Sequence, residues 1–80
     1  MLAEEIESIL RKKFAPTQLE LVDEAHLHLG HGAKGGHFRL VIASAHFVGK
    51  KPLERQRMVY EALGNLMREK VHALSMRCLD

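Results

Sequence analysis

Hydrophobic residues recur at helical spacing over the first fourteen positions of the chain. The apolar positions of this stretch are Leu2, Ile6, Ile9, Leu10 and Phe14. Acidic side chains lie in its first turns and basic side chains in its last turn, an arrangement that the helix dipole favours at both ends. Pro16 cannot continue a helix, because its nitrogen carries no hydrogen and its ring clashes with the preceding turn. The pattern therefore predicts an amphipathic helix that ends just before Pro16.

Two segments that follow alternate polar and apolar residues, which is typical of half-buried strands. The first is 18–23 and the second begins near Phe38. Four of the six glycines lie between them, in residues 30–36, and so many glycines favour a loop over a packed element. We therefore expect an antiparallel hairpin with a long, glycine-rich loop. In its second strand, Leu40 occupies the centre of the face that points towards the core.

The rest of the chain combines a longer helical pattern with a final alternating segment. Residues 47–52 form a turn, and Pro52 suits the first position of a helix. An apolar stripe then predicts the longest helix of the chain, over roughly residues 52–69. The stripe consists of Val59, Ala62, Leu63, Leu66 and Met67. The final strand has one face made of Leu74, Met76 and Cys78, and another made of Ser75 and Arg77.

The order helix, strand, strand, helix, strand predicts a single α+β domain over residues 1–80, with helices on one face of a small mixed sheet. A right-handed crossover would make the last strand parallel to the second, so that both begin at the end where the hairpin loop lies. His72, just ahead of the last strand, then comes to the same edge as His28, His31 and His37. The topology thus predicts a histidine cluster built from distant parts of the chain.

Six histidines and one cysteine concentrate the metal-binding capacity of the chain in imidazole, which binds zinc, copper and iron. Binding of a free transition metal by the loop is therefore one interpretation. The spacing His26-x-His28-x-x-His31 is not that of a zinc finger, and no cysteine pair or HExxH helix accompanies it, which argues against a closed structural zinc site. A simpler interpretation makes His26, His31 and His46 exposed, solvated residues. For His72, the simpler interpretation is a packed, hydrogen-bonded histidine at the edge of the core.

The sequence lacks the motifs of several common enzyme classes. It has no Gly-x-Ser-x-Gly elbow, no P-loop and no Gly-x-Gly-x-x-Gly after a strand, and no residue pair suggests a nucleophile with its base. Cys78 is in phase with its apolar neighbours, so we interpret it as an inert core thiol. A binding or delivery protein, and not an enzyme, fits these features.

The single cysteine, the N-terminal sequence and the charge distribution further narrow the class of protein. One cysteine excludes an internal disulfide, and the N-terminus shows no apolar leader, so we expect a protein of the reducing cytoplasm. No apolar run approaches the roughly 20 residues needed to cross a bilayer. The net charge of +2 does not by itself indicate a nucleic-acid binder, but basic residues gather locally. This basic patch consists of Lys50, Lys51, Arg55 and Arg57 around Glu54.

Motifs spread over nearly the whole chain resemble those of the BolA family. They are Val22-Asp23-Glu24, His37-Phe38, the stretch Phe47-x-Gly49-x-x-Pro52-Leu53-x-Arg55-x-Arg57-x-Val59-Tyr60, and Val71-His72-Ala73-Leu74. The Arg-His-Arg that is usual in the family's second helix is here Arg55-Gln56-Arg57, which keeps the two arginines and loses the histidine. The resemblance implies a KH-like αββαβ domain of class II, with a small three-stranded mixed sheet and helices on one face.

The resemblance also implies a role in iron–sulfur chemistry. Family members pair with a monothiol glutaredoxin and share a bridging 2Fe-2S cluster with it, in iron sensing or cluster transfer. The glutaredoxin brings its own cysteine and a glutathione thiolate. The BolA partner brings the histidine that corresponds to His72 and a loop ligand, which is cysteine in one subgroup and histidine in another. This loop has no cysteine, so the chain resembles the histidine subgroup; the corresponding position is His28, with His31 close enough to substitute. We expect the isolated chain to carry no cofactor and to be a monomer or a weak dimer.

The basic patch supports an alternative. KH-like folds can bind nucleic acid through a Gly-x-x-Gly loop, and BolA proteins have also been regarded as transcriptional regulators. Here Val48-Gly49-Lys50-Lys51 supplies one glycine where two would let the backbone approach phosphates. Four basic side chains would still give salt-sensitive DNA binding of low specificity. DNA binding through Lys50, Lys51, Arg55 and Arg57 is therefore the second hypothesis.

Overall fold

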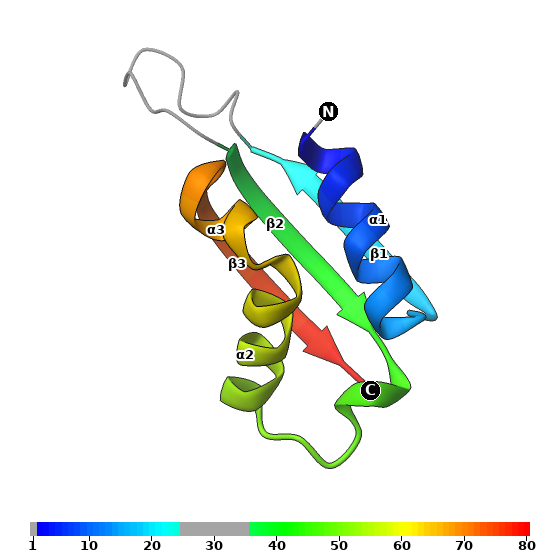
Figure 1. Ribbon diagram of the computed structural model, residues 1–80. Helices are drawn as coiled ribbons and strands as arrows, with labels where there is room; N and C mark the ends of the chain where they lie inside the picture. The colour runs from blue at the N-terminus through cyan, green and yellow to red at the C-terminus, as the bar shows by residue number, and fades with distance from the viewer. Residues whose placement is uncertain (1, 25–35) are drawn as a thin grey trace.

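The computed structural model describes residues 2–24 and 36–80, and at His72 it describes the backbone alone (Figure 1). The elements are α1 (Leu2–Phe14), β1 (Gln18–Asp23), β2 (Gly36–Ala43), the 3-10 helix η2 (Ala45–Phe47), α2 (Pro52–Leu63), α3 (Asn65–Glu69) and β3 (Val71–Leu79). The predicted ends of the first helix and of the first strand are confirmed. Glycine and histidine residues assigned to the hairpin loop at positions 25–35 lie outside the described residues.

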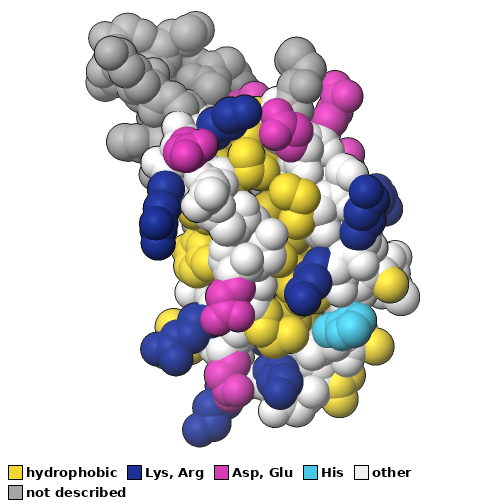
Figure 2. Space-filling view, in the orientation of Figure 1, with side chains coloured by type: hydrophobic (Ala, Val, Ile, Leu, Met, Phe, Trp, Pro, Cys, Tyr) yellow, Lys and Arg dark blue, Asp and Glu magenta, His cyan; other side chains and the backbone are white. Residues whose placement is uncertain are grey.

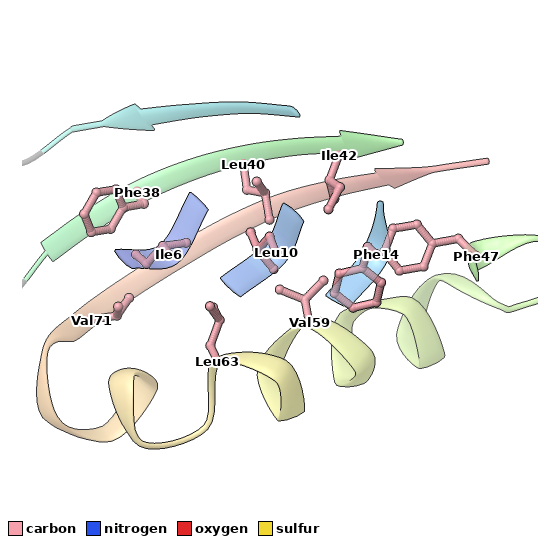
Figure 3. Packing of buried hydrophobic residues seen from close by; sticks show 10 residues of the cluster. All are labelled: Ile6, Leu10, Phe14, Phe38, Leu40, Ile42, Phe47, Val59, Leu63 and Val71. Atoms are coloured by element: carbon pink, nitrogen blue, oxygen red, sulfur yellow. The ribbon is translucent and has the colours of Figure 1, made fainter. Parts of the chain in front are cut away.

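The three strands form one mixed sheet in the order β1-β2-β3. β1 runs antiparallel to β2, with Leu21 opposite Leu40, and β3 runs parallel to β2, with Met76 opposite Leu40. The helices cover one face of this sheet (Figures 1 and 3). On the helical side of the molecule, hydrophobic side chains show between the helices, with acidic and basic side chains around them (Figure 2). The predicted α+β architecture and the parallel crossover are confirmed.

The core lies between the sheet and the helices (Figure 3). Its buried hydrophobic cluster consists of Ile6, Leu10, Phe14, Phe38, Leu40, Ile42, Phe47, Val59, Leu63 and Val71. Ser44 is also fully buried, and its Oγ donates a hydrogen bond of 2.7 Å to the carbonyl oxygen of Phe14. The same Oγ accepts a hydrogen bond from the backbone N–H of His46. This buried hydroxyl ties the end of α1 to the end of β2.

The prediction of one long helix over residues 52–69 is wrong. α2 ends at Leu63, and α3 begins at Asn65, because Gly64 between them has a φ of 53°. That left-handed backbone interrupts the helical hydrogen-bond ladder and is accessible mainly to glycine. Leu66 and Met67 beyond the break still pack against the core, so the apolar stripe continues across it. With 13 residues α1, and not α2 with 12, is the longest helix in the described part of the chain.

The prediction that Gly36 belongs to the loop is also wrong, because this residue begins β2. A Cβ at this position would collide with the ring of Phe38 and would lie 3.0 Å from a methyl of Leu2. Gly36 is therefore required by close packing at the start of a strand. Composition alone does not separate this use of glycine from its use in a flexible loop.

Candidate functional site

The candidate site lies at the end of the sheet where β1 ends and where β2 and β3 begin, which we call the loop edge (Figure 1). The backbone N–H of Glu24 donates a hydrogen bond of 2.6 Å to the carbonyl of His37. The N–H of Gly36 donates one of 2.8 Å to the carbonyl of Lys70. Both ends of the 25–35 segment and the start of β3 are thereby joined at one place. This confirms the predicted convergence of the hairpin with the backbone that carries His72.

A β-bulge lies at His72. Gly36 is opposite Val71 and His37 is opposite Ala73, so His72 is an extra residue in the β3 ladder. The bulge resets the alternation of β3, because Val71 and Leu74 both pack against the core although three positions separate them. The alternating pattern did not predict this bulge, although the odd spacing between these two apolar residues is a sequence signal for it. Bulges often lie beside functional sites, where they change the direction of a side chain.

The predicted ligands themselves are only partly placed. His28 and His31 lie outside the described residues, as does His26, and the backbone of His72 is at the loop edge. His37, the second residue of β2, is half-buried at the same edge. Among the described side chains, no three of His, Cys, Asp and Glu are grouped so as to hold a metal ion.

His46 is not part of the loop edge. It follows the far end of β2, in η2, and it is exposed as predicted. Its ring meets the ring of Phe14 edge-on, with the centroids 6.1 Å apart. His46 is therefore a surface residue packed against the end of α1, and it has no access to a site at the loop edge.

Two ion pairs border the loop edge. Glu5 of α1 lies 3.8 Å from the Nζ of Lys70, and Glu24 lies 3.7 Å from the Nε of Arg39. These side chains are largely exposed, except that Glu24 is less so, and pairs of this kind stabilise a protein by about 0–1 kcal/mol. The first turn of α1 thus forms one border of the candidate site.

The basic patch lies beyond the other end of β2, in the turn before α2 and in its first turns. Lys50, Lys51 and Arg57 are exposed, and Gly49 in the turn has a φ of 78°. β2 spans eight residues, so roughly 25 Å separate this patch from the loop edge. The two candidate sites therefore do not overlap.

Arg55 differs from the other three cations of the patch. Its Nε donates a hydrogen bond of 2.8 Å to the carbonyl of Lys50, and its Nη1 donates one of 3.0 Å to the carbonyl of Cys78. Its Nη2 also forms an ion pair with the carboxylate of Asp80, and its side chain is only 16% exposed. Arg55 is thus engaged in fastening the α2 turn to the end of β3, a function that its place in a cluster of basic residues did not reveal.

Cys78 is half-buried near the end of β3 and packs against the core, as predicted. Burial raises the pKa of its thiol, and the nearby charge of Arg55 offsets part of that effect. A raised pKa reduces the thiolate fraction, which is the form that binds metals and attacks electrophiles. Cys78 is six positions from His72 along β3, which corresponds to roughly 20 Å of strand. Cys78 is therefore unsuited to act at the loop edge.

The family model described as BolA-like protein matches residues 10–80. The chain belongs to the BolA-like family. It is 40% identical over 76 residues to the DNA-binding transcriptional regulator BolA of Escherichia coli K12, covering 95% of this chain and 72% of that protein. It is 39% identical over 74 residues to Protein BOLA2 of Arabidopsis thaliana, covering 92% and 72% of the two chains.

Solved structures of BolA-like proteins have the same fold. The BolA domain of SufE1 from Arabidopsis thaliana superimposes with a TM-score of 0.87 at 34% identity, covering 96% of this chain and 88% of that one. This likeness confirms the fold that the resemblance implied for the BolA-like chain. None of the helices that the structure describes is long and apolar enough to cross a membrane.

Proposed function

We propose that this BolA-like protein is a non-enzymatic iron–sulfur protein that forms a heterocomplex with a monothiol glutaredoxin. His72 and His28 would co-ligate a bridging 2Fe-2S cluster, with His31 able to substitute for His28. The role of the complex would be cluster transfer or iron sensing. The observation that supports this proposal most is the convergence at the loop edge, where both ends of the histidine-bearing segment are bonded beside the start of β2, which pairs with the bulged start of β3.

The donor chemistry of the chain fits such a cluster. A 2Fe-2S centre accepts imidazole in place of thiolate, as Rieske centres show. The segment from Glu24 to Gly36 contains three histidines and no cysteine. The one thiol of the chain, that of Cys78, lies at the far end of β3, where burial raises its pKa. Ligands from this chain would therefore be imidazoles, with thiolates supplied by the glutaredoxin and by glutathione.

Imidazole ligation gives the proposal two chemical consequences. Neutral ligands in place of thiolates remove negative charge from the cluster, so its reduction potential should be higher than that of an all-thiolate cluster. Imidazole also binds a proton with an ordinary pKa of about 6.5, and the proton competes with the metal for the same nitrogen. The shared cluster should therefore be lost in mildly acidic buffer, below about pH 6.

The proposal is tested by mixing the purified protein with a cluster-loaded monothiol glutaredoxin and glutathione. We expect a 1:1 complex in size-exclusion chromatography that keeps its iron and sulfide, and a change in visible absorbance and circular dichroism relative to the glutaredoxin alone. A mixture whose spectrum is the sum of the spectra of its components, with no comigration, would contradict the proposal. Loaded glutaredoxin with the His46→Ala variant serves as a control, because His46 lies away from the loop edge.

DNA binding is a second candidate function. It is favoured by the name of the Escherichia coli relative, DNA-binding transcriptional regulator BolA, and by the exposure of Lys50, Lys51 and Arg57 at the start of α2. Three exposed cations would support weak, salt-sensitive binding to phosphates. Electrophoretic mobility shifts of duplex DNA at several salt concentrations test this candidate, and the absence of any shift at low salt would dispose of it.

A further inference from the structure

The sheet has a second face, on which no described helix lies, and we call it the open face (Figures 1 and 3). The strand register places its side chains in rows that run across β1, β2 and β3. One row is Glu20, Val41 and Arg77, and the next is Val22, Arg39 and Ser75. A shallow depression of about 380 Å³ lies over these two rows. The open face is therefore concave at its centre and carries both acidic and basic groups.

The charges of the first row are arranged with opposite signs about its centre. Glu20 lies on one edge strand, Arg77 lies on the other, and Val41 separates them on β2. Neighbouring strands are about 4.8 Å apart, so the backbones that carry the two charges are about 10 Å apart. Among the described side chains, Glu20 and Arg77 form no ion pair with each other within one chain. A partner surface with the reverse order of charges would pair with both.

A second copy of this chain has that reverse order. A two-fold axis that runs parallel to the strands, between two open faces, places β1 of each copy over β3 of the other. The rows stay at the same height, so Glu20 of each copy faces Arg77 of the other, and Val41 faces Val41. Such an isologous contact is the commonest way in which identical chains associate. The two sheets would pack face to face, with their strands rotated by about 30°.

Arg39 lies near this axis, where it would approach its own counterpart. Its Nε is 3.7 Å from the carboxylate of Glu24, which belongs to the same chain and reduces the repulsion between the two arginines. Val22, which is 41% exposed, would be covered against Ser75 of the other copy. The contact thus buries apolar surface around a central row of two ion pairs.

We propose that the open face is a docking surface for a second copy of the chain, aligned by reciprocal pairing of Glu20 with Arg77. A face of three short strands is small beside the roughly 1,200–2,000 Å² of stable interfaces, so the dimer is weak and in rapid exchange. Ion pairs of partly exposed side chains are screened by salt, and association therefore weakens as the ionic strength rises. This inference does not depend on the iron–sulfur proposal, because Glu20 and Arg77, whose pairing aligns the two copies, lie along the strands away from the loop edge, which adjoins the open face at Arg39.

The test is a charge-reversal series, measured by sedimentation equilibrium at low salt. Glu20→Arg alone and Arg77→Glu alone each place like charges opposite each other, and each should weaken dimerisation by about tenfold or more. An equimolar mixture of the two variants brings opposite charges together again and should restore association, as should the double variant. Glu4→Arg, which makes the same charge change on α1, is the matched control and should associate like the parent.

If the single variants failed to associate because they were unstable, mixing them would not restore association. Restored association in the mixture therefore distinguishes the proposed ion pairs from a general loss of stability. Amide chemical shifts of the parent should also move on dilution at Val41 and Ser75. A parent chain that stays monomeric at millimolar concentration overturns the proposal. So do single variants that associate like the parent, a mixture that stays monomeric, or dilution shifts that fall on the helices.

Discussion

Leu40 shows how much a single buried side chain contributes to the stability of the fold. It is fully buried at the centre of β2, opposite Leu21 on one neighbouring strand and Met76 on the other. Leu40→Ala leaves a cavity in a close-packed core, so we expect it to lower the free energy of unfolding by about 2–5 kcal/mol. Denaturant unfolding followed by circular dichroism measures this change. Val41→Ala, on the open face, should cost less, and equal losses for the two variants would show that the faces are assigned wrongly.

The reactivity of Cys78 is a second residue-level prediction. Since burial raises the pKa of its thiol, the thiolate fraction near pH 8 is smaller in the folded protein than in the unfolded chain. Alkylation by iodoacetamide should therefore be slower in the folded state, and the rate should continue to rise above pH 9. Mass spectrometry of samples quenched at intervals gives both rates. Folded and unfolded chains that react equally fast at pH 8 would contradict this account of the thiol.

At the scale of elements, the break between α2 and α3 depends on Gly64. Its φ of 53° and ψ of −125° are unfavourable for any residue with a Cβ, although the nearest atom to such a Cβ is 3.9 Å away. The cost of Gly64→Ala is therefore backbone strain, about 1–3 kcal/mol of stability. Thermal unfolding checks this value against Glu61→Ala, an exposed change within α2. A more stable Gly64→Ala variant would mean that the helix can continue through this position.

The elements that local patterns predicted and those that they missed differ in physical origin. The end of α1 and the whole of β1 follow from Pro16 and from alternation, both of which act within a few residues. The break at Gly64 and the bulge at His72 arise where the chain has to turn back and pair with β2. Such features depend on tertiary packing, which regular periodicity does not predict, although the odd spacing between Val71 and Leu74 is a sign of the bulge. The same holds for Arg55, whose partners Cys78 and Asp80 lie more than 20 positions away.

At the scale of the whole molecule, the two candidate sites lie at opposite ends of β2, so mutations should separate them. Neutralising Lys50, Lys51 and Arg57 together should weaken any DNA binding and reduce its salt dependence, since each phosphate contact releases counterions. The same triple variant should unfold like the parent. Arg55→Gln should instead lower stability by about 1–3 kcal/mol, because a half-buried carbonyl and Asp80 lose their charged partner.

Mobility-shift titrations at several salt concentrations, paired with denaturant unfolding, check both statements. If Arg55→Gln left stability unchanged and the triple variant lowered it, the roles assigned to these cations would be reversed. Parent-like DNA binding by the triple variant would exclude the basic patch as the binding surface.

The ligand assignment also predicts an asymmetry between the two histidines. The backbone of His72 is fixed by the sheet, whereas His28 belongs to a segment that offers His26 and His31 as neighbours in sequence. His28→Ala should therefore weaken the shared cluster and leave a less stable one. His72→Ala has no such substitute at the start of β3.

The most direct test of the account is the visible absorbance and circular dichroism of His72→Ala titrated into cluster-loaded monothiol glutaredoxin. Far-ultraviolet circular dichroism first verifies that the variant is folded, and Cys78→Ser is the matched control because its thiol lies at the other end of β3. We predict that Cys78→Ser reproduces the spectral change of the parent and that His72→Ala abolishes it. A folded His72→Ala variant that gives the parent's spectrum would contradict the assignment of the loop edge as the cluster site.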